Sequence, residues 1–237
     1  MEQFLTSAVR RYYEIEVPPA KRPPQGWPLL IGMHGYQGDK VSMMHVTTRI
    51  AGGKMVVVSL QGPNQFFVPD GTRRTGKQKA RRVGFGWGTS YRMEESVALH
   101  HANLRALARL ARREYGADGR RVFLLGFSQA CAYNYRFVFT YPRAICGVIS
   151  VCGGVPHDWT ENPLYRPART HVLHIAATQD QWYSRQQNLE FRRQLAERAA
   201  SLDFRFYRTS HRFPHAALPL IRQWIESIIG RSRAASR

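Results

Sequence analysis

The sequence predicts a single domain of the α/β class, in which helices cover both faces of a mostly parallel sheet. Strand-like and helix-like stretches alternate along nearly the whole chain, as they do in repeated strand–helix–strand units. Two early runs, WPLLIGMH at residues 27–34 and KMVVVSL at residues 54–60, are almost continuously apolar. Such runs are typical of strands buried on both faces of a parallel sheet. The length of 237 residues suits one such domain, which we expect to span residues 1–237.

Each remaining element has its own signal. Residues 12–17 alternate in polarity as a strand does, and two prolines follow them. Residues 93–115 predict the longest helix, because apolar side chains recur on one face at helical spacing and Gly116 follows the last turn. Further strands are expected at residues 121–127, 145–151, 171–177 and 203–207, and further helices at residues 129–141, 184–200 and 214–229.

Two long irregular stretches, residues 61–91 and 153–170, interrupt this pattern. Loops of that length inside a compact domain usually carry function. Six of the ten residues 73–82 are Lys or Arg. We therefore treat residues 61–91 as a basic insertion and a candidate lid.

The composition is that of a globular protein, with 43% hydrophobic and 12% aromatic residues. The chain has 35 Lys and Arg against 16 Asp and Glu, a formal net charge of +19, which invites the hypothesis of a nucleic-acid partner. Outside residues 73–82, however, the basic residues are spread along the chain. We interpret most of them as a solvated surface and do not expect nucleic acid to be a partner.

The three cysteines do not predict a disulfide framework. Cys146 and Cys152 are expected on one strand, six residues apart, which separates their Cα atoms by about 20 Å, too far for a disulfide. A reducing cytoplasm is therefore the expected location. The first residues contain no apolar stretch of the signal-peptide type, and no apolar run of 18 residues occurs elsewhere, so we expect neither export nor a membrane span.

Ser128 is the candidate nucleophile. It directly follows the strand at residues 121–127 and directly precedes a helix, in the segment RVFLLGFSQACAY, and a nucleophile elbow requires this strand–turn–helix context. Gly126 keeps side-chain bulk away from the turn, where the serine backbone must be strained. Ala130 stands where the pattern G-x-S-x-G has its second glycine, and we expect the added methyl to affect packing alone. The alternative role of Ser128 is that of an ordinary helix N-cap.

A nucleophilic serine needs a base, and the base needs an orienting acid. Asp180 follows one expected strand by three residues, and His211 follows another by four. The carboxyl ends of parallel strands share one edge of the sheet, so both side chains are expected near Ser128. The competing candidates are Asp158 and Asp203 as the acid and His215 as the base.

An oxyanion hole requires two backbone N–H groups aimed at the developing negative charge. We expect them at Gln129, which begins the helix after the nucleophile, and at Tyr36, in the glycine-containing turn after residues 27–34. Trp182 is expected at the mouth of the site. Phe66 and Trp87, in the insertion, either line a substrate pocket or pin the insertion to the core.

Four segments resemble, in the right order, motifs of the carboxylesterase/phospholipase branch of the α/β-hydrolase superfamily. They are the oxyanion segment LLIGMHGYQGD, the elbow VFLLGFSQACAY, the acid segment HVLHIAATQDQWY and the histidine segment SHRFPHAALPLIRQWIES. The similarity runs from about residue 27 to residue 229, and it extends to dienelactone hydrolases and to esterases like feruloyl esterase and polyester depolymerase. It implies an α/β-hydrolase fold with Ser128 as nucleophile, Asp180 as acid, His211 as base and the amides of Tyr36 and Gln129 as oxyanion hole. Ala130 and the basic insertion depart from the family pattern.

The remaining histidines are assigned structural roles. The resemblance implies that His34, in the HG motif, is structural. His100 and His101 are expected on a helix surface, and His171 and His174 in a strand; we do not expect either pair to bind a metal.

The predicted function is therefore hydrolysis of a small carboxylic ester through a Ser-His-Asp triad and an acyl-enzyme, without metal or cofactor. One alternative within the superfamily is a thioesterase or a dienelactone-type lactone hydrolase. An alternative from another class is a non-catalytic basic protein that binds nucleic acid on a hydrolase scaffold. The sequence leaves the oligomeric state open.

Overall fold

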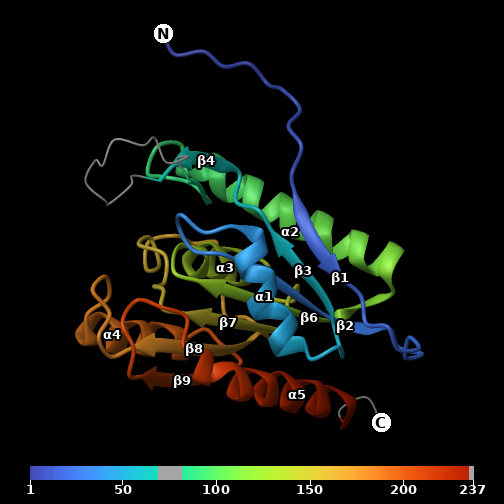
Figure 1. Ribbon diagram of the computed structural model, residues 1–237. Helices are drawn as coiled ribbons and strands as arrows, with labels where there is room; N and C mark the ends of the chain where they lie inside the picture. Colours follow the sequence, from blue (N-terminus) through green and yellow to red (C-terminus); the bar gives the residue numbers. More distant parts are fainter. Residues whose placement is uncertain (69–81, 235–237) are drawn as a thin grey trace, which may run out of the picture.

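A computed structural model describes residues 1–68 and 82–234 of the chain (Figure 1). Within this part, seven strands form one sheet in the order β1-β3-β2-β6-β7-β8-β9. Only β1 runs antiparallel to its neighbour, and all the other neighbouring pairs are parallel. In chain order the strands are β1 (Tyr13–Glu16), β2 (Trp27–Met33), β3 (Val56–Leu60), β6 (Ala117–Phe127), β7 (Gly147–Val151), β8 (His171–Ala177) and β9 (Ser201–Tyr207).

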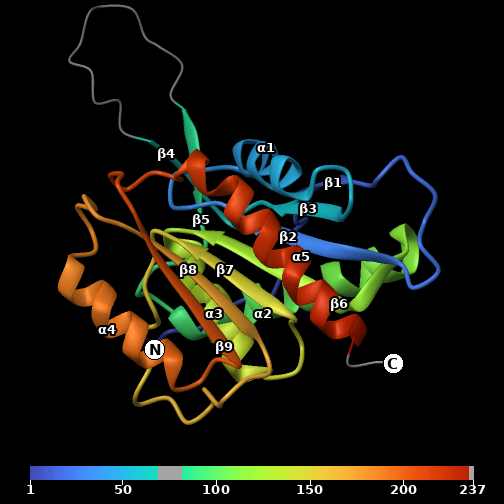
Figure 2. The ribbon, with the colours of Figure 1, turned by 90° about the horizontal axis from the view of Figure 1, so that it is seen from below.

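Helices lie on both faces of the sheet, so the predicted α/β class is confirmed (Figures 1 and 2). They are α1 (Lys40–Ala51), α2 (Met93–Tyr115), α3 (Gln129–Thr140), α4 (Arg185–Ala196), the 3₁₀ turn η1 (His215–Ala217) and α5 (Leu218–Ala234). The two faces are apolar because neighbouring residues of a strand point to opposite sides. Leu29 and Ile31 of β2 pack in the core under α2 and α3, whereas Leu30 packs in the core under α1 and α5.

Helix α1 is an element that the sequence patterns did not predict. Three consecutive β-branched residues, Val46, Thr47 and Thr48, lie inside it, and such residues favour strands over helices. Its ends are well defined, because the Asp39 side chain accepts a hydrogen bond from the Ser42 amide at 2.7 Å and Gly52 ends the helix at a φ of 55°. Tertiary packing of its apolar face on the sheet therefore outweighs local propensity.

The insertion at residues 61–91 contains a second unpredicted feature, the antiparallel hairpin β4–β5. Its strands are β4 (Asn64–Phe67) and β5 (Val83–Gly86), and they pair from Asn64–Gly86 to Phe67–Val83. Most of the basic run at residues 73–82 lies outside the described residues. No helix in the described part of the chain is long and apolar enough to cross a membrane.

The expectation that His100 and His101 lie on a helix surface is wrong. Both are on the buried face of α2, with exposed fractions of 2% and 8%. The edge of the Trp87 ring packs against His100 at 5.6 Å, and His101 contacts the rings of Phe137 and Tyr141. Burial lowers the pKa of His100 to about 3 and that of His101 to about 4. Both side chains are therefore neutral parts of the core.

His174 of β8 is also a neutral core histidine. It is fully buried, stacks on Phe204 with ring centroids 4.6 Å apart, and its Nδ1 lies 2.8 Å from the Tyr135 hydroxyl. Burial lowers its pKa to about 3. His100, His101 and His174 are thus neutral in the core, whereas the unfolded chain would protonate them near the ordinary pKa of 6.5.

We expect stability to fall as the pH decreases below about 6.5, because only the unfolded chain takes up protons at these three histidines. Between pH 6 and pH 4.5 each histidine adds up to about 1.4 kcal/mol per pH unit to the slope of the unfolding free energy. Urea unfolding at several pH values measures this slope. The variant His174→Phe should lower the slope by the contribution of one histidine. The control is His45→Gln, at an exposed position of α1. Stability that stays constant from pH 7 to pH 4.5 would contradict this expectation.

Candidate active site

Three polar side chains follow neighbouring strands at the carboxyl edge of the sheet. Ser128 comes directly after β6, Asp180 comes three residues after β8, and His211 comes four residues after β9. Strands β6, β7, β8 and β9 are consecutive in the sheet. Parallel strands bring their carboxyl ends to one edge, so residues 31 to 83 positions apart in the chain meet there.

The backbone of Ser128 forms a sharp turn from strand to helix, with φ at 54° and ψ at −118°. This left-handed φ is costly for a residue with a side chain. Two hydrogen bonds hold the turn: the Ser128 amide donates to Val151 O at 2.9 Å, and the Cys131 amide donates to Ser128 O at 3.0 Å. The side chain therefore stands away from both β6 and α3.

Three glycines make room for this turn. A Cβ on Gly126 would lie 2.8 Å from Nδ2 of Asn134 and 3.2 Å from the backbone of the first turn of α3. A Cβ on Gly35 would lie 3.1 Å from Cβ of Ser128, and a Cβ on Gly153 would lie 2.6 Å from the carbonyl oxygen of Ser128. Larger side chains at these positions would push the turn away from its neighbours.

A continuous chain of hydrogen bonds connects the three polar side chains. Nε2 of His211 lies 2.8 Å from Oγ of Ser128, and Nδ1 lies 2.9 Å and 3.0 Å from the two carboxylate oxygens of Asp180. The amides of Trp182 and Tyr183 also donate to Asp180 Oδ1. Because the carboxylate only accepts, Nδ1 carries a proton and Nε2 is free to accept the serine proton.

Burial strengthens this arrangement. The Asp180 side chain is 1% exposed and the His211 side chain 11% exposed, so water competes little for their hydrogen bond. The rings of Phe127 and Tyr183 lie 5.3 Å and 6.1 Å from the imidazole. Trp182, with a ring centroid 6.4 Å from that of His211, is 69% exposed and stands at the rim of the site.

The amides of Tyr36 and Gln129 have no protein acceptor within the described residues, whereas those of Gln37 and Ser128, each adjacent to one of them, do. The amide of Gln37 donates to Phe85 O, that of Gly38 donates to Gly35 O, and that of Ser128 donates to Val151 O. Gln129 is the first residue of α3, where the helix dipole favours negative charge. These two amides are therefore available for an oxyanion.

The competing acids and bases make their contacts elsewhere. Asp158 forms an ion pair with the buried Arg136 at 2.6 Å, and Asp203 forms one with Arg205 at 2.5 Å. His215 lies in η1 and packs against Phe213. None of these three side chains takes part in the hydrogen-bond chain from Asp180 to Ser128.

His34 is the buried first residue of the turn at residues 34–38, which is called the oxyanion loop because it holds the candidate donor Tyr36. Its Nδ1 lies 2.8 Å from Gly35 O, and its Nε2 accepts a hydrogen bond from the Gly62 amide at 2.9 Å. Burial lowers its pKa below the ordinary value. A neutral ring with both nitrogens engaged organises the loop and has no free nitrogen for proton transfer.

The two aromatic side chains predicted in the insertion differ in their exposure. Phe66 is half-buried and stacks on the Tyr36 ring with centroids 4.7 Å apart, beside the oxyanion loop. Trp87 is only 1% exposed, and its indole Nε1 donates to His34 O at 2.8 Å. Of the two roles considered for Trp87, the structure places it in the second, as a residue that pins the insertion to the core.

Sequence reasoning singled out Trp87 but missed that its segment VGFGWG, residues 83–88, contacts both candidate donor residues, Tyr36 and Gln129. A Cβ on Gly86 would lie 3.2 Å from the Tyr36 ring and 3.4 Å from Oε1 of Gln129. The signal that could have found it is the glycine at every second position, 84, 86 and 88, since alternate residues of a strand share one face.

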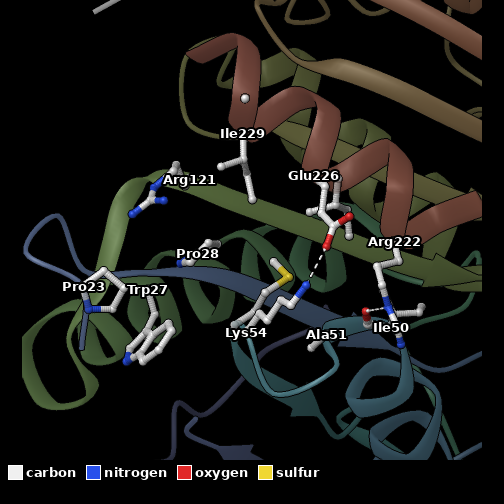
Figure 3. A pocket seen from close by; sticks show the side chains of 13 residues that line it. Pro23, Trp27, Pro28, Ile50, Ala51, Lys54, Arg121, Arg222, Glu226 and Ile229 are labelled. Atoms are coloured by element: carbon white, nitrogen blue, oxygen red, sulfur yellow. Dashed lines mark hydrogen bonds and ion pairs between the residues drawn. The ribbon is translucent and has the colours of Figure 1, made fainter. Parts of the chain in front are cut away.

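No group of three or more His, Cys, Asp or Glu side chains in residues 1–68 and 82–234 is placed to hold a metal ion. A cavity of about 340 Å³ lies at the opposite, amino-terminal edge of the sheet, beside Trp27 and Ile229 (Figure 3). Its charged groups are engaged, because Lys54 pairs with Glu226 and Arg222 donates to Ile50 O.

No family model and no curated protein sequence matches the chain. Solved structures do match its fold. A carboxylesterase from Mesorhizobium loti aligns with a TM-score of 0.70 and 17% identity over 91% of this chain and 94% of that one. A Bacillus cereus carboxylesterase aligns with a TM-score of 0.68 and 17% identity over 92% of this chain and 94% of that one. SOBER1 of Arabidopsis thaliana aligns with a TM-score of 0.65 and 18% identity over 85% of this chain and 99% of that one. The chain therefore has the α/β-hydrolase fold that its motifs implied.

The packing of the elbow predicts opposite results for two substitutions. Gly126→Ala should lower kcat by about 10-fold or more and the unfolding free energy by about 1–3 kcal/mol, because its Cβ meets backbone atoms of α3. Ala130→Gly removes a buried methyl two positions beyond Ser128. It should cost about 1 kcal/mol of stability and keep kcat within about twofold. Ester hydrolysis and urea unfolding of both variants measure the difference. An inactive, folded Ala130→Gly variant would show that the methyl group of Ala130 is needed for the geometry of the turn at Ser128 as well as for packing.

Proposed function

We propose that this protein is a serine hydrolase that cleaves carboxylic esters through an acyl-enzyme intermediate. The observation that carries the proposal is the hydrogen-bond chain from Asp180 through His211 to Ser128, at an elbow flanked by two free amides. The fold shared with carboxylesterases agrees with it. Each of these groups has a distinct task in acyl transfer.

Acylation would begin with attack of Ser128 Oγ on the ester carbonyl carbon, while Nε2 of His211 accepts the serine proton. The carbonyl oxygen becomes an oxyanion and accepts hydrogen bonds from the amides of Tyr36 and Gln129. The carboxylate of Asp180 stabilises the imidazolium. When the tetrahedral intermediate collapses, Nε2–H gives its proton to the leaving alcohol, and the acyl group stays on Ser128.

Deacylation would repeat the same steps with water. Nε2 of His211 accepts a proton from a water molecule as the water oxygen attacks the acyl carbon, and the same two amides stabilise the second oxyanion. Nε2–H then returns the proton to Ser128 Oγ, which releases the carboxylic acid. No step requires a metal or a cofactor.

We infer a small ester as the substrate, whose acyl or alcohol group would contact the aromatic side chains of Trp182 and Phe66 beside the site. Thioesters and lactones present the same carbonyl to Ser128. A panel of p-nitrophenyl esters, acyl thioesters and lactones of equal chain length therefore decides among these substrate classes, and the proposal expects the highest kcat/KM for the carboxylic esters.

We expect Ser128→Ala to lower the hydrolysis of short and medium-chain p-nitrophenyl esters by at least about 10³-fold, because the nucleophile is removed. A fluorophosphonate should label the wild type at Ser128 and leave the variant unlabelled. Ser227→Ala, on the carboxyl-terminal helix α5, is the matched control and should keep full activity. Wild-type protein without turnover and without label at Ser128 would overturn the proposed function.

A further inference from the structure

The hairpin β4–β5 lies against both donors of the proposed oxyanion hole. Gly86 faces both donor residues, because a Cβ there would lie 3.2 Å from the ring of Tyr36 and 3.4 Å from Oε1 of Gln129. A Cβ on Gly84 would likewise lie 3.0 Å from Cα of Gln37. The backbone of the hairpin is therefore packed directly on the side chains of both donor residues and on Gln37, the residue after the first donor.

On the Tyr36 side, the hairpin fixes the chain just after the donor. The Gln37 amide donates to Phe85 O at 2.9 Å, and the Phe85 amide donates to Gly38 O at 3.2 Å. Gln37 has a φ of 67°, a left-handed conformation that costs free energy outside glycine. These two bonds hold that strained turn in place.

Trp87 fixes the chain just before the same donor. Its indole Nε1 donates to His34 O at 2.8 Å, and its ring packs on the His34 ring with centroids 5.2 Å apart. The chain on either side of Tyr36 is thus held by a hydrogen bond, at Gln37 by Phe85 of β5 and at His34 by Trp87, the residue after β5. Its amide, which has no acceptor in the described part of the protein, keeps a fixed direction.

Trp87 is connected to the second donor as well. The Gln129 side chain accepts a hydrogen bond from the Trp87 amide at 3.0 Å and donates one to Gly88 O at 2.8 Å. The indole of Trp87 therefore bonds to the oxyanion loop, and its backbone bonds to the residue that begins α3. One residue connects the two sides of the hole.

We propose that Trp87 is a positioning residue of the oxyanion hole, which sets the distance and direction of the Tyr36 and Gln129 amides relative to each other. This role rests on the proposed function. The developing charge exists only in the transition state, so misaligned donors lower kcat and leave substrate binding unchanged. A role in core packing alone would change stability and leave the kcat of the folded enzyme unchanged.

The test is Trp87→Phe, which keeps an aromatic ring and removes the indole donor. We expect kcat for a p-nitrophenyl ester to fall by about 10-fold or more with KM within about twofold, less than the ~10²–10³-fold loss of a whole donor. The matched control is Trp159→Phe, at an equally buried tryptophan whose Nε1 has no partner in the described structure. It should keep kcat within about twofold.

A trifluoromethyl ketone gives a second readout. Ser128 Oγ adds to its carbonyl carbon, the serine proton moves to His211 Nε2, and the carbonyl oxygen becomes an oxyanion in the hole. We expect the inhibition constant to rise in Trp87→Phe by the same factor by which kcat/KM falls, and to stay unchanged in Trp159→Phe. An unchanged inhibition constant would overturn the positioning role.

Gln129→Met tests the other side of the same connection if Trp87→Phe does not fold. It removes both side-chain hydrogen bonds and keeps the backbone amide, and it should show the same loss of kcat at constant KM. Folded variants with unchanged kcat, a rise in KM alone, or an equal loss in Trp159→Phe would each overturn the positioning role. An inactive wild type would overturn the proposed function itself.

Discussion

The left-handed backbone of Ser128, with φ at 54° and ψ at −118°, is the constraint on which the rest of the site depends. Such a conformation costs about 1–3 kcal/mol for a residue with a side chain and persists only where its surroundings enforce it. The surroundings of Ser128 enforce this conformation. The Ser128 amide is bonded to the end of β7, and Gly35, Gly126 and Gly153 leave space that any Cβ would fill. The strain sets Oγ at the tip of the turn, in line with His211.

The sheet supplies the remaining geometry. Because β6, β7, β8 and β9 are consecutive and parallel, the loops after them share one edge. His211 and Asp180, which follow β9 and β8 by four and three residues, therefore lie within hydrogen-bond reach of Ser128 and of each other. The Asp180 carboxylate is held twice, by His211 and by the amides that follow it in the chain. Helix α3 begins with Gln129, directly after Ser128, and the amide of Gln129 has no acceptor within the described residues. The hairpin β4–β5 lies against Tyr36 and Gln129.

Much of this could be predicted from the sequence, because the informative residues stand at the ends of strong local patterns. Ser128, Asp180 and His211 each follow a recognisable strand, and the alternation of strands and helices fixes which edge those ends share. The insertion was harder. Its alternating glycines at 84, 86 and 88 gain meaning only from residues around 36 and 129, far away in the chain.

The two errors have different physical origins. His100 lies three residues after Val97 and four before Leu104, so its spacing places it on the apolar face of α2, where Trp87 and Tyr133 enclose it. Its polarity suggested a surface position, and the helical spacing was the better guide. Helix α1 contains β-branched residues that locally favour a strand, and packing of Met43 and Ile50 on the sheet overrides them. In that case long-range burial decides the outcome, and local sequence does not show it.

The most direct measurement of the central claim is the mass of the enzyme during turnover. Wild-type protein mixed with excess p-nitrophenyl acetate, quenched in acid and digested, should carry one acetyl group on the peptide that contains Ser128. The modified fraction should rise with the initial burst of p-nitrophenol and fall once the substrate is consumed. Sustained turnover with no acetyl group on Ser128, or with the acetyl group on another residue, would contradict the account.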